Sequence, residues 1–357
     1  MRVVIVGAGP AGLISALNLI QGGISPVVLE KQSAIRSTAC GEACDLQSLS
    51  NIPFDSEQYI CRKVKGVKLI YPDSTCSYIN RSSVILDRTN WLKGMAKEIE
   101  ARGGQIRLDS EVVAIEEDSI QLKNGEKIDY EILIGADGPN SCIARYLGMK
   151  HQFVVASQYK LACDTSDMDY LEFYFGRRFS SGYCWIFPKD GVINVGVIGD
   201  FTRLDAFLRN KGLNSYRIIK REAGIIPVSG IQKLVQYNIA LIGDSASMPN
   251  PLSGGGLTSI VYATQVLARH ISNLKNYEWE VKKHPIAAPA LWKARQVLLG
   301  LADKDVVNLL SSLTEPHHGK VKFPSVVRIL KYPSLILELK ALISVYQAVR
   351  ISKDYGW

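Results

Sequence analysis

A glycine-rich turn between apolar runs opens the chain and constrains its fold more than any other feature. Residues 3–6 (VVIV) form an apolar run with the length of a buried strand, and residues 13–19 carry apolar side chains at helical spacing. Between them lies GAGPAG, residues 7–12, and a further apolar run over residues 26–29 ends at Glu30. The order strand, glycine turn, helix, strand and acid predicts a dinucleotide-binding unit.

Each residue of this motif has a physical role in holding a dinucleotide. Gly7 allows the tight turn, Gly9 allows the backbone to approach a pyrophosphate, and Gly12 allows the helix to pack closely on the strand. The helix N-terminus favours the pyrophosphate charge, and Glu30 can accept hydrogen bonds from a ribose hydroxyl. A glycine-rich strand turn without a ligand is the alternative interpretation, and the motif alone does not choose between FAD and NAD.

The composition is that of a globular protein. The chain has 357 residues, of which 47% are hydrophobic and 21% charged, enough for one large or two ordinary domains. No apolar stretch has the length of a membrane-spanning helix. The N-terminus enters a strand directly, so we expect no secretory signal and a cytoplasmic location. The net charge of +8 is compatible with a nucleic acid, an anionic membrane or a phosphorylated substrate, and selects none of them.

The seven cysteines do not indicate a disulfide framework, because their number is odd and no secretory signal is expected. None has the spacing of a zinc site, so no metal is predicted. Cys61 and Cys76 flank a predicted hairpin, which leaves a bridge between them open.

Two further strands end in a glycine followed by an acid. Residues 132–139 read ILIGADGP and residues 238–246 read NIALIGDSA. Ligands of open α/β sheets gather at the carboxyl ends of strands, so Asp137 and Asp244 lie where a ligand would bind. A helix N-cap is the alternative role of Asp137. The turn PLSGGG at 251–256 precedes a long predicted helix, whose N-terminus offers a positive partial charge to a reduced flavin.

Residues 151–236 differ in character from the rest of the chain, because they read as long strands rich in aromatic residues. Strand side chains alternate between faces, which places Tyr183, Trp185 and Phe187 together. Core packing is the ordinary explanation of such a stripe. The functional explanation is an apolar wall that binds a hydrophobic substrate.

Taken together, three separated motifs resemble the FAD-dependent family that includes p-hydroxybenzoate hydroxylase: GAGPAG with Glu30, GADGP at 135–139, and GDSA with PLSGGG at 243–256. Within that family, Cys40-Gly41-Glu42 and the pattern YxWxFP at 183–188 resemble the geranylgeranyl reductases, which saturate double bonds of isoprenoid chains. The resemblance spans roughly residues 2–270 and fades in the tail.

The resemblance implies a role for each matching position. It places the ADP half of FAD on the first glycine turn, the flavin beside the loop at Cys40, and the adenine on the backbone of a short strand. The predicted cofactor-binding residues, with Asp137 included for its place at a strand end, are Gly7, Gly9, Ala11, Gly12, Glu30, Cys40, Gly41, Ala43, Arg88, Val113, Asp137, Asp244, Gly255, Gly256 and Leu257. The predicted catalytic residues are Cys40, Tyr183 and Trp185, and the substrate wall is Tyr183, Trp185, Phe187 and Pro188.

The expected activity is hydride transfer from reduced FAD to one carbon of an isolated C=C bond, with a proton from Cys40 reaching the other carbon. A free thiol, with an ordinary pKa of about 8.5, cannot fully protonate an alkene first. Proton delivery therefore has to accompany hydride transfer, with both groups held in place. An FAD-dependent monooxygenase of the same fold and a flavin-bearing prenyl-lipid carrier without turnover are the alternatives.

The expected architecture is a mixed α/β chain with a Rossmann-like FAD-binding domain, an inserted antiparallel-sheet substrate domain and a helical C-terminal region. The ranges are 1–58, 81–150 and 237–275 for the FAD-binding domain, 59–80 and 151–236 for the substrate domain, and 276–357 for the helical region.

The expected partners are a prenylated lipid or quinone, an external electron donor such as NAD(P)H or ferredoxin, and no nucleic acid. In the basic tail, Leu335, Ile336, Leu339, Leu342, Ile343 and Tyr346 share a helical face. That face either covers the core or makes a peripheral contact with the inner surface of a membrane.

Overall fold

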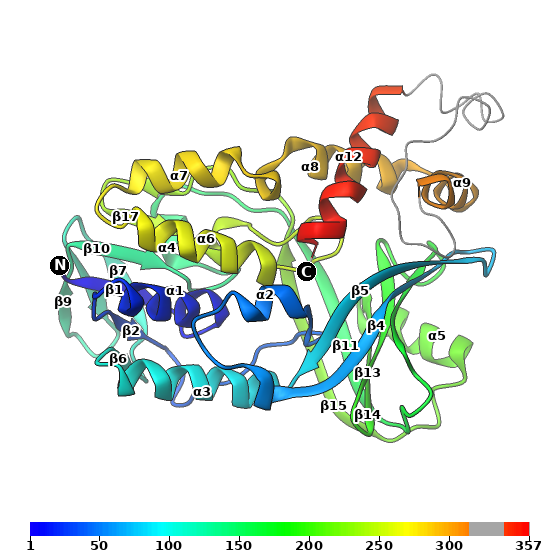
Figure 1. Cartoon of the computed structure of the whole chain (residues 1–357), viewed down its shortest axis with the longest axis horizontal. Helices are drawn as coiled ribbons and strands as arrows, with labels where there is room; N and C mark the ends of the chain where they lie inside the picture. Colours follow the sequence, from blue (N-terminus) through cyan, green and yellow to red (C-terminus); the bar gives the residue numbers. More distant parts are fainter. Residues whose placement is uncertain (314–338, 357) are drawn as a thin grey trace.

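The computed structural model describes the backbone of residues 1–313 and 339–356, and the side chains of residues 1–310 and 342–356. The predicted apolar residues Leu335, Ile336 and Leu339, and most of the basic residues of the tail, lie outside the described side chains. The molecule is elongated, with the N-terminal sheet at one end and a larger antiparallel sheet at the other (Figure 1). Helices of the C-terminal region lie along one side of both.

A six-stranded sheet forms the expected nucleotide-binding core. Its order is β16-β17-β10-β1-β2-β6, and every pair is parallel except β16 with β17. The short apolar runs of the sequence form its central strands because both faces are covered, as buried parallel strands require. The strands are β1 (Val3–Val6), β2 (Val27–Leu29), β6 (Gln105–Arg107), β10 (Ile132–Gly135), β16 (Val235–Gln236) and β17 (Ile239–Leu241).

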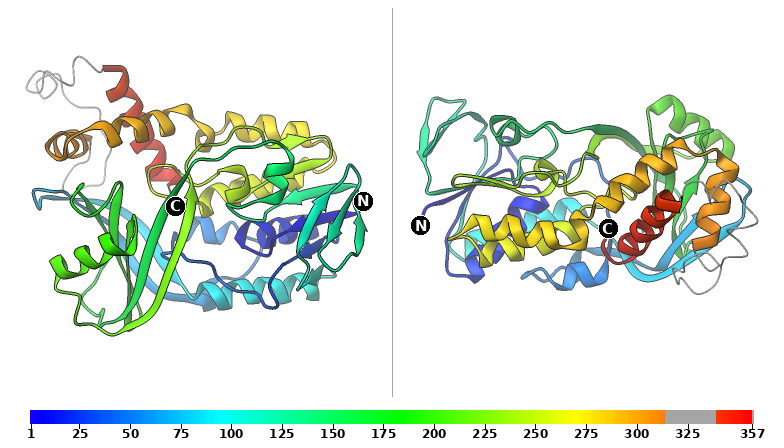
Figure 2. Two further views of the ribbon diagram at one scale, coloured as in Figure 1. Left: turned by 180° about the vertical axis from the view of Figure 1, so that it is seen from behind. Right: turned by 90° about the horizontal axis from the view of Figure 1, so that it is seen from above.

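Helices cover one face of this sheet, and a small three-stranded sheet lies across the other (Figure 2, right). Asp87 caps the helix that begins at Arg88 by accepting a hydrogen bond from the Asn90 backbone N–H. The helices are α1 (Pro10–Gln21), α3 (Arg88–Ala101), α6 (Leu257–Arg269) and α7 (Leu274–Lys283). The small sheet consists of β7 (Val112–Ile115), β8 (Ser119–Leu122) and β9 (Lys127–Asp129), next to the short helix α4 (Cys142–Tyr146).

The second domain is an eight-stranded sheet of order β15-β11-β14-β13-β12-β4-β5-β3, antiparallel except where β12 pairs with β4. The aromatic stretch of the sequence forms its middle strands. They are β3 (Ala43–Asp45), β4 (Ile60–Ile70), β5 (Cys76–Leu86), β11 (Phe153–Ala162), β12 (Tyr170–Phe175), β13 (Tyr183–Lys189), β14 (Val192–Ile198) and β15 (Ile218–Pro227). Helix α5 (Phe201–Lys211) packs on this sheet, and α2 (Leu46–Ser50) follows β3.

The expected domain boundary between residues 80 and 81 is wrong, because it falls inside β5. That strand pairs with β4 from Cys76 to Leu86, so the whole hairpin belongs to the larger sheet. Residues 43–45 also join this sheet by pairing with β5. The apolar run 84–86 reads alone as a short strand, and only the pairing with β4 shows that it continues the hairpin. We propose the end of β5 as the boundary.

The described part of the C-terminal region covers the core. Helices α8 (Pro289–Gly300), α9 (Asp303–Leu313) and α12 (Leu339–Tyr355) lie over the junction of the two sheets, and the chain returns to the middle of the molecule at residue 356 (Figures 1 and 2). On α12, Leu342 and Val345 are buried against Leu291 of α8, whereas Ile343 stays exposed. Core packing therefore explains most of the apolar face where it is described.

All seven cysteines are free thiols. The hairpin register places Cys76 opposite Ile70, while Ile60 pairs with Leu86 at the other end of the hairpin. Cys61 and Cys76 are thus far apart along the hairpin, which excludes a bridge between them.

Candidate active site

The first glycine turn has the geometry that its sequence predicts. Gly7 has a φ of 104°, and a Cβ there would collide with the carbonyl of Ala136, which directly follows the neighbouring strand β10. A Cβ on Gly12 would collide with the Gly7 carbonyl, so close packing of α1 on β1 requires that glycine. A Cβ on Gly9, in contrast, would meet no atom within 4 Å. The backbone is therefore open at the one glycine that a pyrophosphate would approach.

The acid after β2 already organises this turn. Glu30 accepts hydrogen bonds from the backbone N–H of Ala8, at 2.9 Å, and of Gln32, at 3.0 Å. It lies at the carboxyl end of its strand, where the ribose of a dinucleotide would lie. Its ribose contact remains a prediction.

Asp137 acts as a helix cap, which was the alternative interpretation of its motif. Its carboxylate accepts hydrogen bonds from the Ser141 hydroxyl, at 2.5 Å, and from the Cys142 backbone N–H, at 2.7 Å. Both oxygens are thereby engaged at the N-terminus of α4. A contact with the cofactor is not what this geometry favours.

A cavity of about 420 Å³ lies where the two sheets meet. Loops from the nucleotide-binding core form one side, and β13 of the antiparallel sheet forms the other. The predicted residues that line it are Cys40, Gly41, Ala43, Arg88, Tyr183, Trp185, Phe187, Asp244, Gly255, Gly256 and Leu257. The other predicted residues do not line it. Val113 is exposed on β7, Asp137 caps α4, and Pro188 is buried further along β13. The residues of the first glycine turn and the acid after β2 also lie outside its lining: Gly7, Gly9, Ala11, Gly12 and Glu30.

The loop that carries Cys40 is held tightly against this cavity. Arg88 donates a hydrogen bond from Nη1 to the Cys40 Sγ, 2.6 Å away, and the Gln158 side chain donates to the Cys40 carbonyl at 3.0 Å. A Cβ on Gly41 would lie 2.8 Å from the Phe187 ring, so the loop can pack on the aromatic strand only with glycine there. The thiol, the glycine and the aromatic wall therefore form one unit.

Asp244 has a raised pKa and a buried carboxylate, as expected of a group that binds a ligand. Burial raises its pKa to about 6, and the Arg88 guanidinium opposes that rise. Among the described residues, its carboxylate accepts no side-chain hydrogen bond, and the buried Nε of Arg88 also lacks a partner. A carboxylate, a guanidinium N–H and the start of α6 all face the cavity without protein partners. Ribityl hydroxyls and a flavin ring would satisfy these groups, so the site fits FAD.

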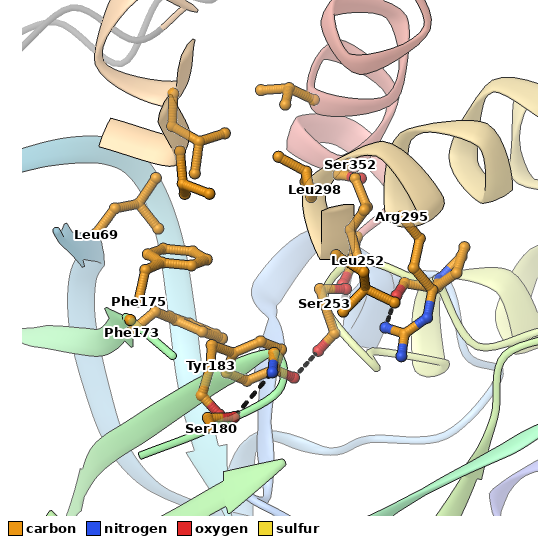
Figure 3. A pocket seen from close by; sticks show the side chains of 18 of the residues that line it. Leu69, Phe173, Phe175, Ser180, Tyr183, Leu252, Ser253, Arg295, Leu298 and Ser352 are labelled. Carbon is orange, nitrogen blue, oxygen red and sulfur yellow. Dashed lines mark hydrogen bonds between the residues drawn. The ribbon is translucent and has the colours of Figure 1, made fainter. Parts of the chain in front are cut away.

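A second cavity, of about 450 Å³, adjoins the first and is mainly apolar (Figure 3). It lies between the antiparallel sheet and the C-terminal helices, and its walls include Leu69, Phe175, Leu252 and Leu298. The residues that line both cavities are Phe173, Tyr183, Ser253 and Gly356.

Hydrogen bonds join three elements where the cavities meet. The Tyr183 hydroxyl donates to the Ser253 carbonyl (Figure 3), and the Ser253 hydroxyl donates to the Gly356 carbonyl. Burial raises the pKa of Tyr183, so its hydroxyl stays protonated. The Trp185 indole N–H is also engaged, with the Gln158 side-chain oxygen at 3.2 Å. Tyr183 and Trp185 thus form walls, with their polar atoms bound to protein.

Sequence reasoning missed the polar residues behind the Cys40 loop and the C-terminal wall of the second cavity. Asn194 left a signal, because it is a polar residue inside the apolar run VINVGVI. Gln158, Lys160 and Lys189 left none, since polar residues at these positions are ordinary for a half-exposed strand. Arg295, which donates to the Pro251 carbonyl at 3.0 Å beside the second cavity, lies in the tail where no motif matches.

Comparisons with known proteins agree with this geometry. Residues 1–48 match an FAD binding domain, residues 152–224 a geranylgeranyl reductase catalytic domain, and residues 201–304 a lycopene cyclase protein family. Digeranylgeranylglycerophospholipid reductase 3 of Methanosphaera stadtmanae is 26% identical over 92% of this chain and 94% of its own.

Solved structures give the same picture. A geranylgeranyl bacteriochlorophyll reductase-like protein of Thermoplasma acidophilum superposes with a TM-score of 0.80 and 26% identity, covering 96% of this chain and 98% of its own. The p-nitrophenol 4-monooxygenase of Pseudomonas putida is more distant, with 15% identity, a TM-score of 0.66 and coverage of 99% of this chain and 98% of its own, and shows the fold alone.

The nucleotide-binding sheet, the antiparallel sheet and the cavity between them define an FAD-dependent oxidoreductase. The match to the reductase catalytic domain falls on the strands that wall this cavity. Among these enzymes, the chain is similar to the geranylgeranyl reductases over most of its length.

Proposed function

We propose that this protein saturates isolated C=C bonds in the isoprenoid chains of membrane lipid or quinone precursors. The observation that carries the proposal is the pair of adjoining cavities. One cavity is lined by Cys40 and by the groups predicted to bind the flavin, and the other is mainly apolar and adjoins it at Tyr183. A long apolar chain in the second cavity could bring its double bonds, one at a time, into the first.

FAD, when bound in its two-electron-reduced form, supplies the hydride to one alkene carbon. The chain's own residues place the alkene and deliver the proton. Tyr183, Trp185 and Phe187 form an apolar wall that excludes water, and the Cys40 thiol on the opposite loop gives its proton to the second carbon. The thiolate left behind accepts a hydrogen bond from Arg88 and regains a proton from solvent.

We further propose that FAD lies across the core in the order of its motifs. The ADP half would contact Gly7, Gly9, Ala11, Gly12 and Glu30, with the adenine near Val113. The flavin end would contact the groups that line the first cavity, above all Arg88, Asp244 and the turn at 255–257. Support comes from the open face at Gly9 and from the unpartnered polar groups at the cavity.

Product mass tests the proposal directly. A geranylgeranyl lipid incubated under nitrogen with dithionite-reduced protein should gain mass in steps of two hydrogen atoms. A gain of one oxygen atom, seen only in air, would show a monooxygenase. Unchanged lipid that remains bound would show a carrier. Either of these outcomes contradicts a reductase.

We also propose that the protein takes its electrons from an external donor, such as NAD(P)H or ferredoxin, and acts at a membrane surface as a peripheral protein. Among the described residues, no helix is long and apolar enough to cross a membrane. A prenylated lipid has little solubility in water, so contact with the bilayer would supply it.

A further inference from the structure

Glu42 is a buried carboxylate in a strained backbone conformation, two residues after Cys40. Its side chain is 5% exposed, and its φ of 65° lies in the left-handed region that residues with a Cβ rarely adopt. A buried charge and a left-handed backbone each oppose folding. They persist together only where the surroundings fix them, so the contacts of Glu42 need an explanation.

Three side chains of the antiparallel sheet hold this carboxylate. The Lys160 Nζ lies 2.7 Å from Oε1, the Lys189 Nζ lies 3.0 Å from Oε2, and the Asn194 amide donates to Oε2 at 3.2 Å. Burial raises the pKa of Glu42, but the hydrogen bonds and charges of Lys160 and Lys189 outweigh it and hold the pKa below its usual value. The carboxylate is therefore ionised and fully engaged.

The same contacts reach Cys40 through the backbone. The Glu42 backbone N–H donates to the Cys40 Sγ at 3.2 Å, and the Asn194 amide also donates to the Gly41 carbonyl at 3.0 Å. Any shift of Glu42 thus moves the thiol. None of the three partner side chains lines the first cavity, so their effect on chemistry has to pass through this loop.

We propose that Lys160 and Lys189 are positioning residues, which act through Glu42 to hold the Cys40 thiol toward the cavity between the two sheets. They tie the loop of the nucleotide-binding core to β11 and β13 of the antiparallel sheet. The kinetic part of the test below rests on the proposed reductase function, whereas the thiol-labelling part does not.

Thiol labelling of the FAD-bound protein tests the positioning without any substrate. Iodoacetamide labelling of Cys40, followed by peptide mass spectrometry with Cys76 as internal reference, should quicken by about threefold or more in Lys160→Met and in Glu42→Gln, because the loop opens more often. Lys65→Met is the matched control. It removes the same charge from the same sheet, where Lys65 pairs with Asp169 at 2.5 Å on the exposed face, and should leave Cys40 labelling unchanged.

A double variant shows whether the lysine acts through the carboxylate. Lys160→Met with Glu42→Gln should label no faster than Glu42→Gln alone, since the shared interaction is already lost. Lys160→Arg keeps the ion pair with Glu42, so its Cys40 should be labelled at the wild-type rate. It also keeps the proposal testable if Lys160→Met fails to fold, as does Lys189→Met, which removes the other partner.

Single-turnover kinetics then connect the loop to chemistry. In Lys160→Met, flavin content and dithionite reduction should match the wild type, while reoxidation of the flavin by a prenyl lipid slows by about 10- to 100-fold. Wild-type labelling rates in Lys160→Met, Lys189→Met and Glu42→Gln would overturn the positioning role. Faster labelling in variants of a protein that reduces no alkene would uphold the positioning and reject the proposed function.

Discussion

Cys40 is the residue on which the proposed chemistry depends. Its thiol lines the first cavity and accepts a hydrogen bond from Arg88. Cys40→Ala should keep FAD and its reduction by dithionite, but lose alkene reduction by about 10²- to 10⁴-fold, the usual contribution of a general acid. Cys40→Ser should recover little, because a hydroxyl is a much weaker acid than a thiol.

The matched control is Cys44→Ala, which removes a buried thiol on the next strand and should affect the rate far less. The readout is stopped-flow reoxidation of the reduced flavin without oxygen. Near-wild-type rates in Cys40→Ala would remove the thiol from the mechanism.

Asp244 is expected to strengthen FAD binding in a way that depends on pH. At pH 8, Asp244→Ala should bind FAD more weakly by about 1.5–3 kcal/mol, the value of a hydrogen bond to a charged group. Because the pKa of Asp244 is raised to about 6, the wild-type carboxylate becomes protonated as pH falls through that value, and its advantage should shrink.

The raised pKa of Asp244 also affects the stability of the cofactor-free protein, and here the favourable effect is at low pH. An acid whose pKa is higher in the folded state than its ordinary value of 3.8 stabilises the fold at low pH, and this contribution is lost as pH rises toward about 6.

Fluorescence titration of the apoprotein with FAD from pH 5 to pH 8 measures the effect of Asp244→Ala on FAD binding. Equal FAD affinity of the wild type and Asp244→Ala at every pH would show that Asp244 does not contact the cofactor.

Among the elements, α12 forms part of the wall of the second cavity, and Gly356, which follows it, lines both cavities. Arg81 of β5 donates to the Lys353 and Asp354 carbonyls at its C-terminus, the latter at 2.9 Å, and lies 3.1 Å from the buried carboxylate of Asp45. Arg81→Ala should lower the free energy of unfolding by about 3 kcal/mol, because it leaves that carboxylate without its charged partner.

Arg81→Lys should lose less, since it keeps the charge but loses the two-pronged contact with the helix. Lys123→Ala, which breaks the exposed pair with Glu111, is the control and should have little effect. Urea unfolding measures all three. An Arg81→Ala protein as stable as the wild type would mean that α12 is held by its apolar face alone.

Among the helices, strands and turns, the sequence predicts those features that depend on residues close together in the chain. The glycine turns, the parallel strands and the Asp87 cap follow from residues close together in the chain. The extent of β5 does not, because it follows from pairing with β4 and not from the apolar run at 84–86 alone. The contacts of Glu42 do not either, because their partners Lys160 and Lys189 are more than a hundred residues away in the chain. Asp137 shows the remaining ambiguity, since one pattern fits both a ligand contact and a helix cap.

For the whole molecule, the sequence predicts the two-sheet architecture and most of the residues that line the first cavity. It does not predict the apolar cavity under the C-terminal helices, because no motif marks their side chains. The cavity follows only from how α8, α9 and α12 lie over the sheet.

Membrane association is a prediction for the whole molecule, whose net charge is +8. Binding to anionic vesicles should be reversible and weaken with salt, since each Lys or Arg near the surface contributes about 1 kcal/mol. Sedimentation with anionic and with neutral vesicles, at low and at high salt, measures this. No binding to anionic vesicles at low salt would reject the peripheral location.

The central claim is that electrons from the flavin end in a C=C bond. The most direct measurement follows flavin absorbance during an oxygen-free single turnover with a geranylgeranyl lipid, and then the mass of the same lipid. We predict that each flavin reoxidised corresponds to one pair of hydrogen atoms gained by the lipid. Flavin that stays reduced until oxygen is admitted, with the lipid unchanged before that point, would contradict the account.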